Sequence, residues 1–189
     1  EAMLFVEAAG YDVVIVETVG VGQSETDVAN LTDVFVLMQL PNAGDDLQAL
    51  KKGVVELADL IVYNKRDLDP AAADRAMSQM AGALGLLRPA SVHWKPKVLG
   101  ASALTRDGIA AFWREVVACR DALERSGDLA AKRTRQALAW TWHLVDAGLR
   151  ARFDANAAVQ AALAPVLEQV ASGALTPTAA AAHLLSAAS

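Results

Sequence analysis

The sequence lacks the features that define several large classes of protein. Cys119 is the single cysteine among 189 residues, which excludes an internal disulfide and favours a reducing compartment. No run of 18 apolar residues occurs, so we expect no membrane-spanning helix. The net charge of −5 and the pI of about 5.1 provide no basic field for nucleic acid or anionic lipid. We therefore expect a soluble, cytoplasmic protein whose partners include neither a membrane nor nucleic acid.

The residue patterns of several kinds of active site are also missing. The three histidines, His93, His143 and His183, have no cysteine or carboxylate at metal-ligand spacing, which argues against a zinc site. No Gly-x-Ser-x-Gly elbow and no Cys–His pair indicates nucleophilic catalysis. The phosphate loop G-x-x-x-x-G-K-[ST] is absent, and the dipeptide Gly-Lys does not occur.

Apolar sequence, in contrast, is plentiful enough for a core, with 54% hydrophobic and 21% charged residues. Short and nearly all-apolar runs predict strands that are covered on both faces, namely Val13–Val16, Val34–Leu37, Leu60–Tyr63 and Val98–Leu99. Segments of helical period alternate with them, namely Asp46–Leu57, Pro70–Leu84 and Ile109–Leu123. This alternation predicts an α/β fold of three layers with a mainly parallel sheet.

The character of the sequence changes at about residue 127. No strand candidate follows Ala130, alanine dominates, and the apolar residues keep helical spacing. The pattern predicts one helix over Ala157–Ala171, and Thr176-Pro177 predicts an N-cap and first position of a final helix through Leu185. We therefore divide the chain into an α/β part, residues 1–126, and an all-helical C-terminal extension, residues 127–189.

The tetrapeptide Asn64-Lys65-Arg66-Asp67 follows the predicted strand Leu60–Tyr63, at the end where open parallel sheets bind ligands. Guanine presents two donors, N1–H and the 2-amino group, which a single carboxylate can accept together, and Asp67 suits that role. Asn64 would tether neighbouring loops, and the stem of Lys65 would lie against the base. The alternative is a polar turn after a strand, because Asn and Asp are common turn formers.

The tripeptide Ser102-Ala103-Leu104 lies between the predicted strand Val98–Leu99 and the helix that follows, where a guanine-binding loop would close over the base. Its backbone amides could donate to the carbonyl oxygen of guanine, a group that adenine lacks. Taken alone, the tripeptide fits an ordinary strand-to-helix loop better. Its position next in order after Asn64–Asp67 favours the nucleotide-binding interpretation.

The segment from Glu17 to Gln23, E-T-V-G-V-G-Q, places a carboxylate at the end of the predicted strand Val13–Val16. A carboxylate there can hold Mg²⁺, directly or through water, opposite the phosphates of a nucleotide. Gly20 and Gly22 would let the backbone approach a γ-phosphate and rearrange when it leaves. The alternative is a plain glycine-rich loop between a strand and a helix.

A polar segment follows the predicted strand Val34–Leu37. Asp45, Gln48 and Lys51 are spaced by three residues, so they share one face of the first helical turns. Such a face next to a nucleotide could sense its phosphate state. The alternative, which these residues by themselves favour, is a solvated helix start with acids near its N-terminus.

Several of these stretches together resemble the metallochaperone GTPases associated with methylmalonyl-CoA mutase, the MeaB/ArgK/MMAA family. The most specific part is the string from Gly10 to Glu25, G-Y-D-V-V-I-V-E-T-V-G-V-G-Q-S-E. The stretch Leu40–Lys52 and the Asn64–Asp67 tetrapeptide are similar to the family in order and spacing. So is the tail, with Gln136, Trp140 and Trp142 followed by Gly173-Ala174-Leu175-Thr176-Pro177.

The resemblance implies a GTPase that escorts an adenosylcobalamin-dependent methylmalonyl-CoA-type mutase, gates cofactor delivery and protects the enzyme. GTP or GDP and Mg²⁺ would be its cofactors. It implies that Glu17 is the carboxylate on the Mg²⁺ side. It also implies that the segment Glu17–Glu25, with Gly20 and Gln23, is the second switch of the GTPase.

Two further roles follow from the same resemblance. Asp45, Gln48 and Lys51 match an additional switch that rearranges when the mutase binds. The helical tail matches an arm used for homodimerisation.

The chain also departs from the family pattern. Asn42 stands where a glycine is usual, and Arg66-Asp67-Leu68 replaces the common Ala-Asp-Gly. The phosphate loop and the aspartate of the first switch are missing. We therefore expect the C-terminal part of such a GTPase, with the phosphate-binding third upstream and little nucleotide affinity of its own, because phosphate contacts dominate such binding.

Two alternatives stay open at this point. One is a non-catalytic dimerisation or partner-binding module derived from such a GTPase. The other is a related nickel-insertion chaperone, which the lack of His and Cys metal ligands disfavours.

Overall fold

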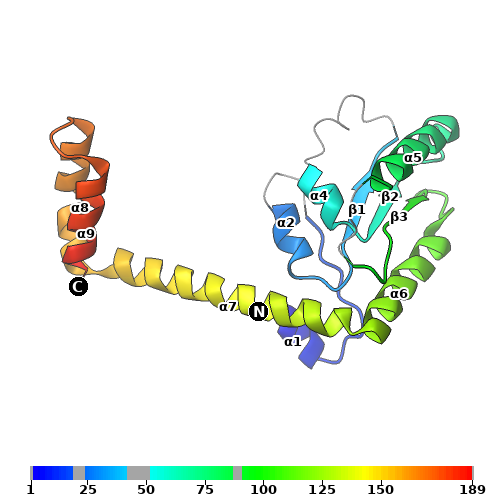
Figure 1. Ribbon diagram of the computed structural model, residues 1–189, viewed down its shortest axis with the longest axis horizontal. Coiled ribbons are helices and arrows are strands. Elements are labelled where there is room, and N and C mark those ends of the chain that lie inside the picture. The colour runs from blue at the N-terminus through cyan, green and yellow to red at the C-terminus, as the bar shows by residue number, and fades with distance from the viewer. Residues whose placement is uncertain (1, 19–23, 42–51, 87–90, 189) are drawn as a thin grey trace. The chain divides into compact units, whose positions relative to one another are not determined.

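The computed structural model describes residues 2–18, 24–41, 52–86 and 91–188. With the labels of Figure 1, the elements are α1 (Ala2–Ala8), α2 (Ser24–Ala29), β1 (Val36–Gln39), α4 (Lys52–Leu57), β2 (Leu60–Tyr63), α5 (Pro70–Leu84), β3 (Lys97–Gly100), α6 (Ile109–Ser126), α7 (Asp128–Ala155), α8 (Ala157–Ala171) and α9 (Pro177–Ala187).

The three strands form one parallel sheet in the order β1-β2-β3. Val36 of β1 pairs with Leu60 of β2, which pairs in turn with Lys97 of β3. Parallel neighbours need a crossover connection, and helices supply it here, with α4 before β2 and α5 before β3. The α/β class predicted from the sequence is confirmed.

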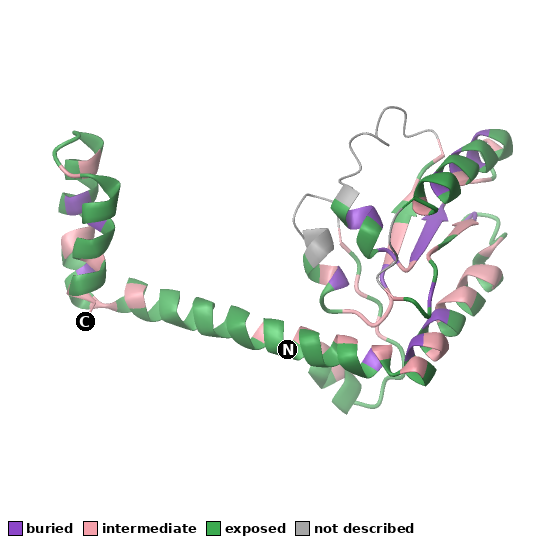
Figure 2. Ribbon diagram, in the orientation of Figure 1, coloured by how far each residue is buried: buried purple, intermediate pink, exposed green. Residues whose placement is uncertain are grey.

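Strand β2 is buried along its whole length because helices cover both faces of the sheet (Figure 2). On one face Ile61 and Tyr63 join a core to which helices α2, α4 and α5 contribute. On the other face Leu60 packs with Cys119 and Leu123 of α6. Side chains alternate between the faces of a strand, so a strand between two cores reads as an unbroken apolar run. Cys119 is a fully buried thiol.

Helices α5 and α8 and strand β2 have the bounds that the sequence predicts. The start of α9 is also confirmed, because the Oγ1 of Thr176 accepts from the N–H of Ala179 and Pro177 is the first helical residue. Strand β1 begins two residues later than predicted. The reason is the partner strand, since β2 pairs only from Leu60 onward and the N–H of Phe35 donates to the carboxylate of Asp59 instead.

The strand predicted over Val13–Val16 is wrong, since residues 13–18 form no regular element. Among the described residues no strand pairs with this segment, and the side chains of Val13 and Ile15 are 52% and 85% exposed. An apolar run becomes a strand only when a neighbour accepts and donates its backbone hydrogen bonds. The short helix α1 was not predicted.

The chain divides into two compact units, residues 1–136 and residues 137–189, and helix α7 contributes to both. In the second unit α8 and α9 pack together, and Val159, Val166 and Ala180 are buried. The division at residue 126 that we predict corresponds to the break between α6 and α7 at Gly127, and it stays a prediction. In the part of the chain that the structure describes, no helix is long and apolar enough to cross a membrane.

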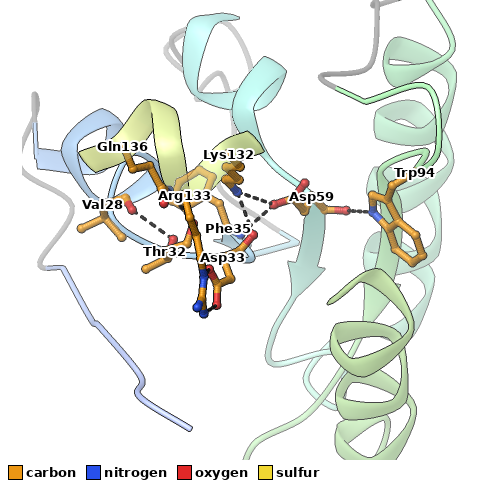
Figure 3. Close-up of polar contacts among 9 residues, drawn as sticks. All are labelled: Val28, Thr32, Asp33, Phe35, Asp59, Trp94, Lys132, Arg133 and Gln136. Carbon is orange, nitrogen blue, oxygen red and sulfur yellow. Dashed lines mark hydrogen bonds and ion pairs between the residues drawn. The ribbon is translucent and has the colours of Figure 1, made fainter. Parts of the chain in front are cut away.

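A polar network joins the first turns of α7 to the amino ends of the strands (Figure 3). The carboxylate of Asp59 accepts from the N–H of Phe35 at 2.9 Å and lies 3.5 Å from the Nζ of Lys132. The carbonyl oxygen of Asp59 accepts from the indole of Trp94 at 2.9 Å. Lys132 also donates to the carbonyl oxygen of Asp33 at 2.8 Å. We call these groups, together with the contacts described next, the amino-end network.

Two more side chains of α7 extend the amino-end network to the turn after α2. Arg133 forms a two-pronged hydrogen bond with the carboxylate of Asp33, and this contact raises the pKa of Arg133 above its ordinary value. Gln136 donates to the carbonyl oxygen of Thr32 at 3.0 Å. The start of α7 is therefore held to the α/β unit by hydrogen bonds to groups about a hundred residues earlier in the chain.

Candidate functional site

The candidate site lies at the opposite, carboxyl ends of the strands. The last residues of β2 and β3, Tyr63 and Gly100, are paired in register. The N–H of Ala101 still donates to the carbonyl oxygen of Tyr63 at 2.9 Å, one step beyond β3. The loops that begin at Asn64 and Ala101 therefore leave the sheet side by side, as the sequence interpretation requires.

Asn64 links the end of β1 to the loops that follow β2 and β3. Its side-chain oxygen accepts from the N–H of Lys65 at 2.8 Å and from the N–H of Ala103 at 3.1 Å. Its own N–H donates to the carbonyl oxygen of Gln39 at the end of β1, at 2.9 Å. The tether that we expect of Asn64 is therefore observed.

Asp67 occupies an exposed turn between β2 and α5. Lys65, also exposed, has a left-handed backbone with φ of 60°, and its carbonyl oxygen accepts from the N–H of Leu68 at 3.1 Å. Asp69 then caps α5 by accepting from the N–H of Ala72 at 2.9 Å. The carboxylate of Asp67 makes no hydrogen bond or ion pair with any described residue, so its oxygens are open to a donor pair from outside the protein.

The loop after β3 is held by its own hydrogen bonds. The side chain of Ser102 is buried, with its Oγ accepting from the N–H of Thr105 at 3.0 Å. The N–H of Ser102 donates to the carbonyl oxygen of Asp107 at 2.9 Å, and that of Ala103 donates to Asn64. Of the three amides expected to face a guanine carbonyl, two therefore have acceptors already. The one without an acceptor among the described residues is that of Leu104, whose side chain is exposed.

Gly108 makes this loop possible. Its φ is +75°, and a β-carbon built on it would lie 2.3 Å from the carbonyl oxygen of Gly100. A side chain at this position would push the loop away from the end of β3 and separate it from Asn64. The sequence analysis did not single out Gly108 for this role.

The sequence analysis also missed two charged residues beside the two loops. Arg66 was noted only within its tetrapeptide and as a departure from the family pattern, and Asp107 was given no role. The guanidinium of Arg66 lies 3.0 Å from the carboxylate of Asp74 on α5 and 3.8 Å from that of Asp107. The sequence did contain one signal for Arg66. It is a charged residue within a tetrapeptide whose other members already had proposed roles.

Of the remaining candidate residues, the structure describes only Glu17. Glu17 ends the segment that we expected to be a strand, and its side chain is exposed. Five other candidates lie outside the described residues, namely Gly20, Gln23, Asp45, Gln48 and Lys51. Within the described ranges no group of three His, Cys, Asp or Glu residues could hold a metal ion. One exposed carboxylate still suits Mg²⁺ that is held mainly by nucleotide phosphates and water.

Comparison with known proteins yields consistent matches. A family model described as methylmalonyl Co-A mutase-associated GTPase MeaB matches residues 1–158. A Caulobacter vibrioides protein named as a GTPase is 47% identical over 188 residues, which cover 100% of this chain and 57% of that protein. The mouse protein named methylmalonic aciduria type A homolog, mitochondrial, is 40% identical over 188 residues, covering 99% of this chain and 45% of that protein.

A solved structure gives the same result for the fold. The crystal structure titled LAO/AO transport system kinase matches with a TM-score of 0.76 and 38% identity, over 97% of this chain and 59% of that chain. The predicted architecture, part of a P-loop NTPase fold followed by a helical extension, is therefore confirmed. The chain spans about half the length of the curated relatives that it matches.

Proposed function

The chain belongs to the MeaB family of methylmalonyl Co-A mutase-associated GTPases, and on that premise we propose that the full-length protein binds and hydrolyses GTP as the chaperone of an adenosylcobalamin-dependent acyl-CoA mutase. The observation that carries the proposal is the open carboxylate of Asp67. Asp67 follows Asn64 by three residues in the same loop, and the side chain of Asn64 ties this loop to the loop that bears the amide of Leu104.

Base recognition follows from this arrangement. Asp67 accepts from N1–H and the 2-amino group of guanine, and the N–H of Leu104 donates to the guanine carbonyl oxygen. The stem of Lys65 covers the ring. Adenine offers an acceptor at N1 and a donor in place of the carbonyl, so it mismatches both contacts.

Hydrolysis requires parts of the site beyond the base. Mg²⁺, when bound, neutralises charge on the phosphates, and Glu17 would hold it directly or through water. Gly20 and Gln23 belong to the second switch in this proposal, and they respond to the γ-phosphate. Asp45, Gln48 and Lys51 form the switch that responds to the mutase.

The decisive experiment changes the base preference. We expect the full-length protein with Asp67→Asn to turn over GTP with a KM raised about a hundredfold, because two charge-assisted hydrogen bonds are lost. The same variant should favour xanthosine triphosphate. Its 2-carbonyl can accept a hydrogen bond from the side-chain NH2 of the new asparagine, whereas the natural carboxylate is only an acceptor. Asp146→Asn, at an exposed position of α7, is the matched control and should behave like the natural protein. Equal turnover of ATP and GTP by the natural protein would overturn the proposal.

The mutase partner is tested by stimulation. GTP turnover by the full-length protein should rise when an adenosylcobalamin-dependent mutase is added. Lys51→Ala should reduce this rise and leave the rate without the mutase unchanged. An unrelated acyl-CoA enzyme serves as the control. Turnover that is indifferent to the mutase would contradict the chaperone role and leave a GTPase of another purpose.

We also propose homodimerisation through residues 127–189. The observation that favours it is a stripe of exposed apolar residues on α7, namely Leu138, Trp142, Val145 and Leu149. Light scattering should give about twice the chain mass of 19.9 kDa, and Trp142→Glu should give the monomer mass. Ala147→Glu, on another face of the same helix, is the matched control. A natural chain that is monomeric at micromolar concentration would contradict this assignment.

A further inference from the structure

We infer that Arg66 is a positioning residue of the base site, which sets the preference for guanine by cross-linking the loop of Asp67 to the loop of Leu104. The inference rests on the proposed function. Guanine would be read from two loops at once, so its recognition depends on the distance between them. Three contacts of Arg66 act on that distance.

The first contact is made by the backbone. The N–H of Arg66 donates to the carbonyl oxygen of Ala101 at 3.1 Å. This bond lies one residue before Asp67 on one loop and one residue before Ser102 on the other. It continues the pairing of the strands into the loops, and it places Arg66 at the point where they diverge.

The second contact is made by the guanidinium. Its Nε and Nη2 lie 3.1 Å and 3.0 Å from the Oδ1 of Asp74 on α5, and its Nη1 lies 3.8 Å from the Oδ2 of Asp107. Asp107 is also the residue whose carbonyl oxygen accepts from the N–H of Ser102. One planar cation therefore joins the helix after the first loop to the second loop, in a fork that a lysine cannot reproduce.

The third contact is made by the stem of the side chain. A β-carbon built on Gly100 would lie 2.8 Å from the Cδ of Arg66 and 2.9 Å from the Sδ of Met77. The stem of Arg66 therefore crosses directly over the end of β3, in space that only a glycine leaves open. The side chain is 37% exposed overall, so its guanidinium stays partly hydrated.

These contacts predict an effect on selectivity rather than on folding. Exposed ion pairs contribute little to stability, and the carboxylates of Asp74 and Asp107 are mostly exposed. Small displacements of a recognition group, in contrast, weaken its directional hydrogen bonds steeply. Loss of Arg66 should therefore leave the melting temperature within about 2 °C of the natural value.

The experiment compares GDP with inosine diphosphate, which lacks the 2-amino group and so loses one bond to Asp67. We expect the full-length natural protein to bind GDP about tenfold to a hundredfold more tightly. Arg66→Ala should weaken the binding of GDP about fivefold and that of inosine diphosphate less than twofold. The ratio of the two affinities should therefore contract towards one. Titration calorimetry measures both affinities.

Four further variants separate the contacts. Arg66→Met keeps the stem without the charge and should contract the ratio nearly as much as Arg66→Ala, while Arg66→Lys should restore part of it. Gly100→Ala should contract it too, because the new methyl group displaces the stem of Arg66. Arg75→Ala removes an exposed arginine of α5 that contacts no described charged group, and it should leave the ratio unchanged.

The outcomes distinguish this inference from the proposed function. If the natural protein prefers GDP but every Arg66 variant keeps its ratio, the role of Arg66 is overturned and the GTPase proposal stands. A contraction caused equally by Arg75→Ala would overturn it as well, since loss of any nearby charge would then suffice. If the natural protein binds GDP, inosine diphosphate and ADP alike, both proposals fail.

Discussion

The two ends of the sheet carry polar clusters of opposite character. At the amino ends, Asp59 and Lys132 are largely enclosed, and their polar atoms are paired with protein groups. At the carboxyl ends, the carboxylate of Asp67 and the amide of Leu104 are exposed and have no partner among the described residues. Buried polar groups destabilise a fold unless they are paired. Exposed polar groups are hydrated, so they can stay without a protein partner at little cost in folding free energy. The difference separates polar groups that hold the fold together from those that we propose bind a nucleotide.

The largest expected effect comes from breaking the amino-end network at its centre. Asp59→Ala should lower the free energy of unfolding by about 2–3 kcal/mol, because the N–H of Phe35 loses its acceptor and Lys132 loses its carboxylate. Urea denaturation of the 189-residue chain measures the change. The exposed variant Asp146→Ala should stay within about 0.5 kcal/mol of the natural chain. A loss below about 1 kcal/mol for Asp59→Ala would show that the network contributes little to stability.

The next effect concerns the thiol beneath the same network. Burial, assisted by the charge of Asp59, raises the pKa of Cys119 to about 12. Because the folded pKa is the higher one, the stabilisation is complete below the ordinary thiol pKa of about 8.5 and is lost as the pH rises towards 12. At pH 10 this loss should reach about 1–2 kcal/mol.

The control for that prediction is Cys119→Ala, which should flatten the decline in stability between pH 8 and pH 10 whatever its own stability. Equal slopes for the two proteins would contradict the assignment of the pH dependence to this thiol. Urea midpoints at each pH provide the measurement.

A smaller effect is expected at the exposed rim of the network. Arg133→Ala should cost about 0.5–1 kcal/mol, because its two-pronged bond to Asp33 is well formed but the arginine is mostly exposed. Part of this cost should disappear in 1 M salt. Arg135→Ala, an exposed arginine of the same helix, is the matched control and should cost nothing measurable. A cost above about 2 kcal/mol would place Arg133 with the enclosed part of the network.

The smallest effect on stability is expected at the carboxyl ends. Asp67→Ala should change the free energy of unfolding by less than about 0.5 kcal/mol, because its carboxylate makes no hydrogen bond or ion pair with a described residue. The same change should abolish the preference of the full-length protein for guanine. Denaturation and nucleotide titration of one variant thus test both halves of the comparison. A loss of stability above about 1 kcal/mol would show that Asp67 is a structural residue.

Elements with strong local signals were predicted closely. Strand β2 is an apolar run between polar turns, and α5 begins with Asp69-Pro70, a cap followed by a proline at the first helical position. The candidate residues Asn64 and Ser102 were found by their place after such strands. Their contacts with Lys65, Ala103 and Thr105 then follow from two loops leaving neighbouring strands together.

Other features had no local signal. The run Val13–Val16 has the composition of a strand, yet it has no strand partner among the described residues and stays irregular. The amino-end network joins α7 to residues of the first third of the chain, and nothing in the sequence near Lys132 or Gln136 indicates such partners. In the sequence Arg66 is only a departure from the family pattern. The structure places its stem over Gly100 and its guanidinium near Asp107, and no local pattern predicts these two neighbours.

The sequence by itself determined the alternation of strands and helices, the helical tail and the tetrapeptide that we propose reads a guanine edge. These depend on periodicity, caps and residue chemistry over a few neighbouring positions. Only the tertiary structure decided which polar groups are paired within the protein and which are exposed without a partner among the described residues. That distinction arises when loops distant in sequence meet at an end of the sheet, because pairing and burial depend on every element that packs there.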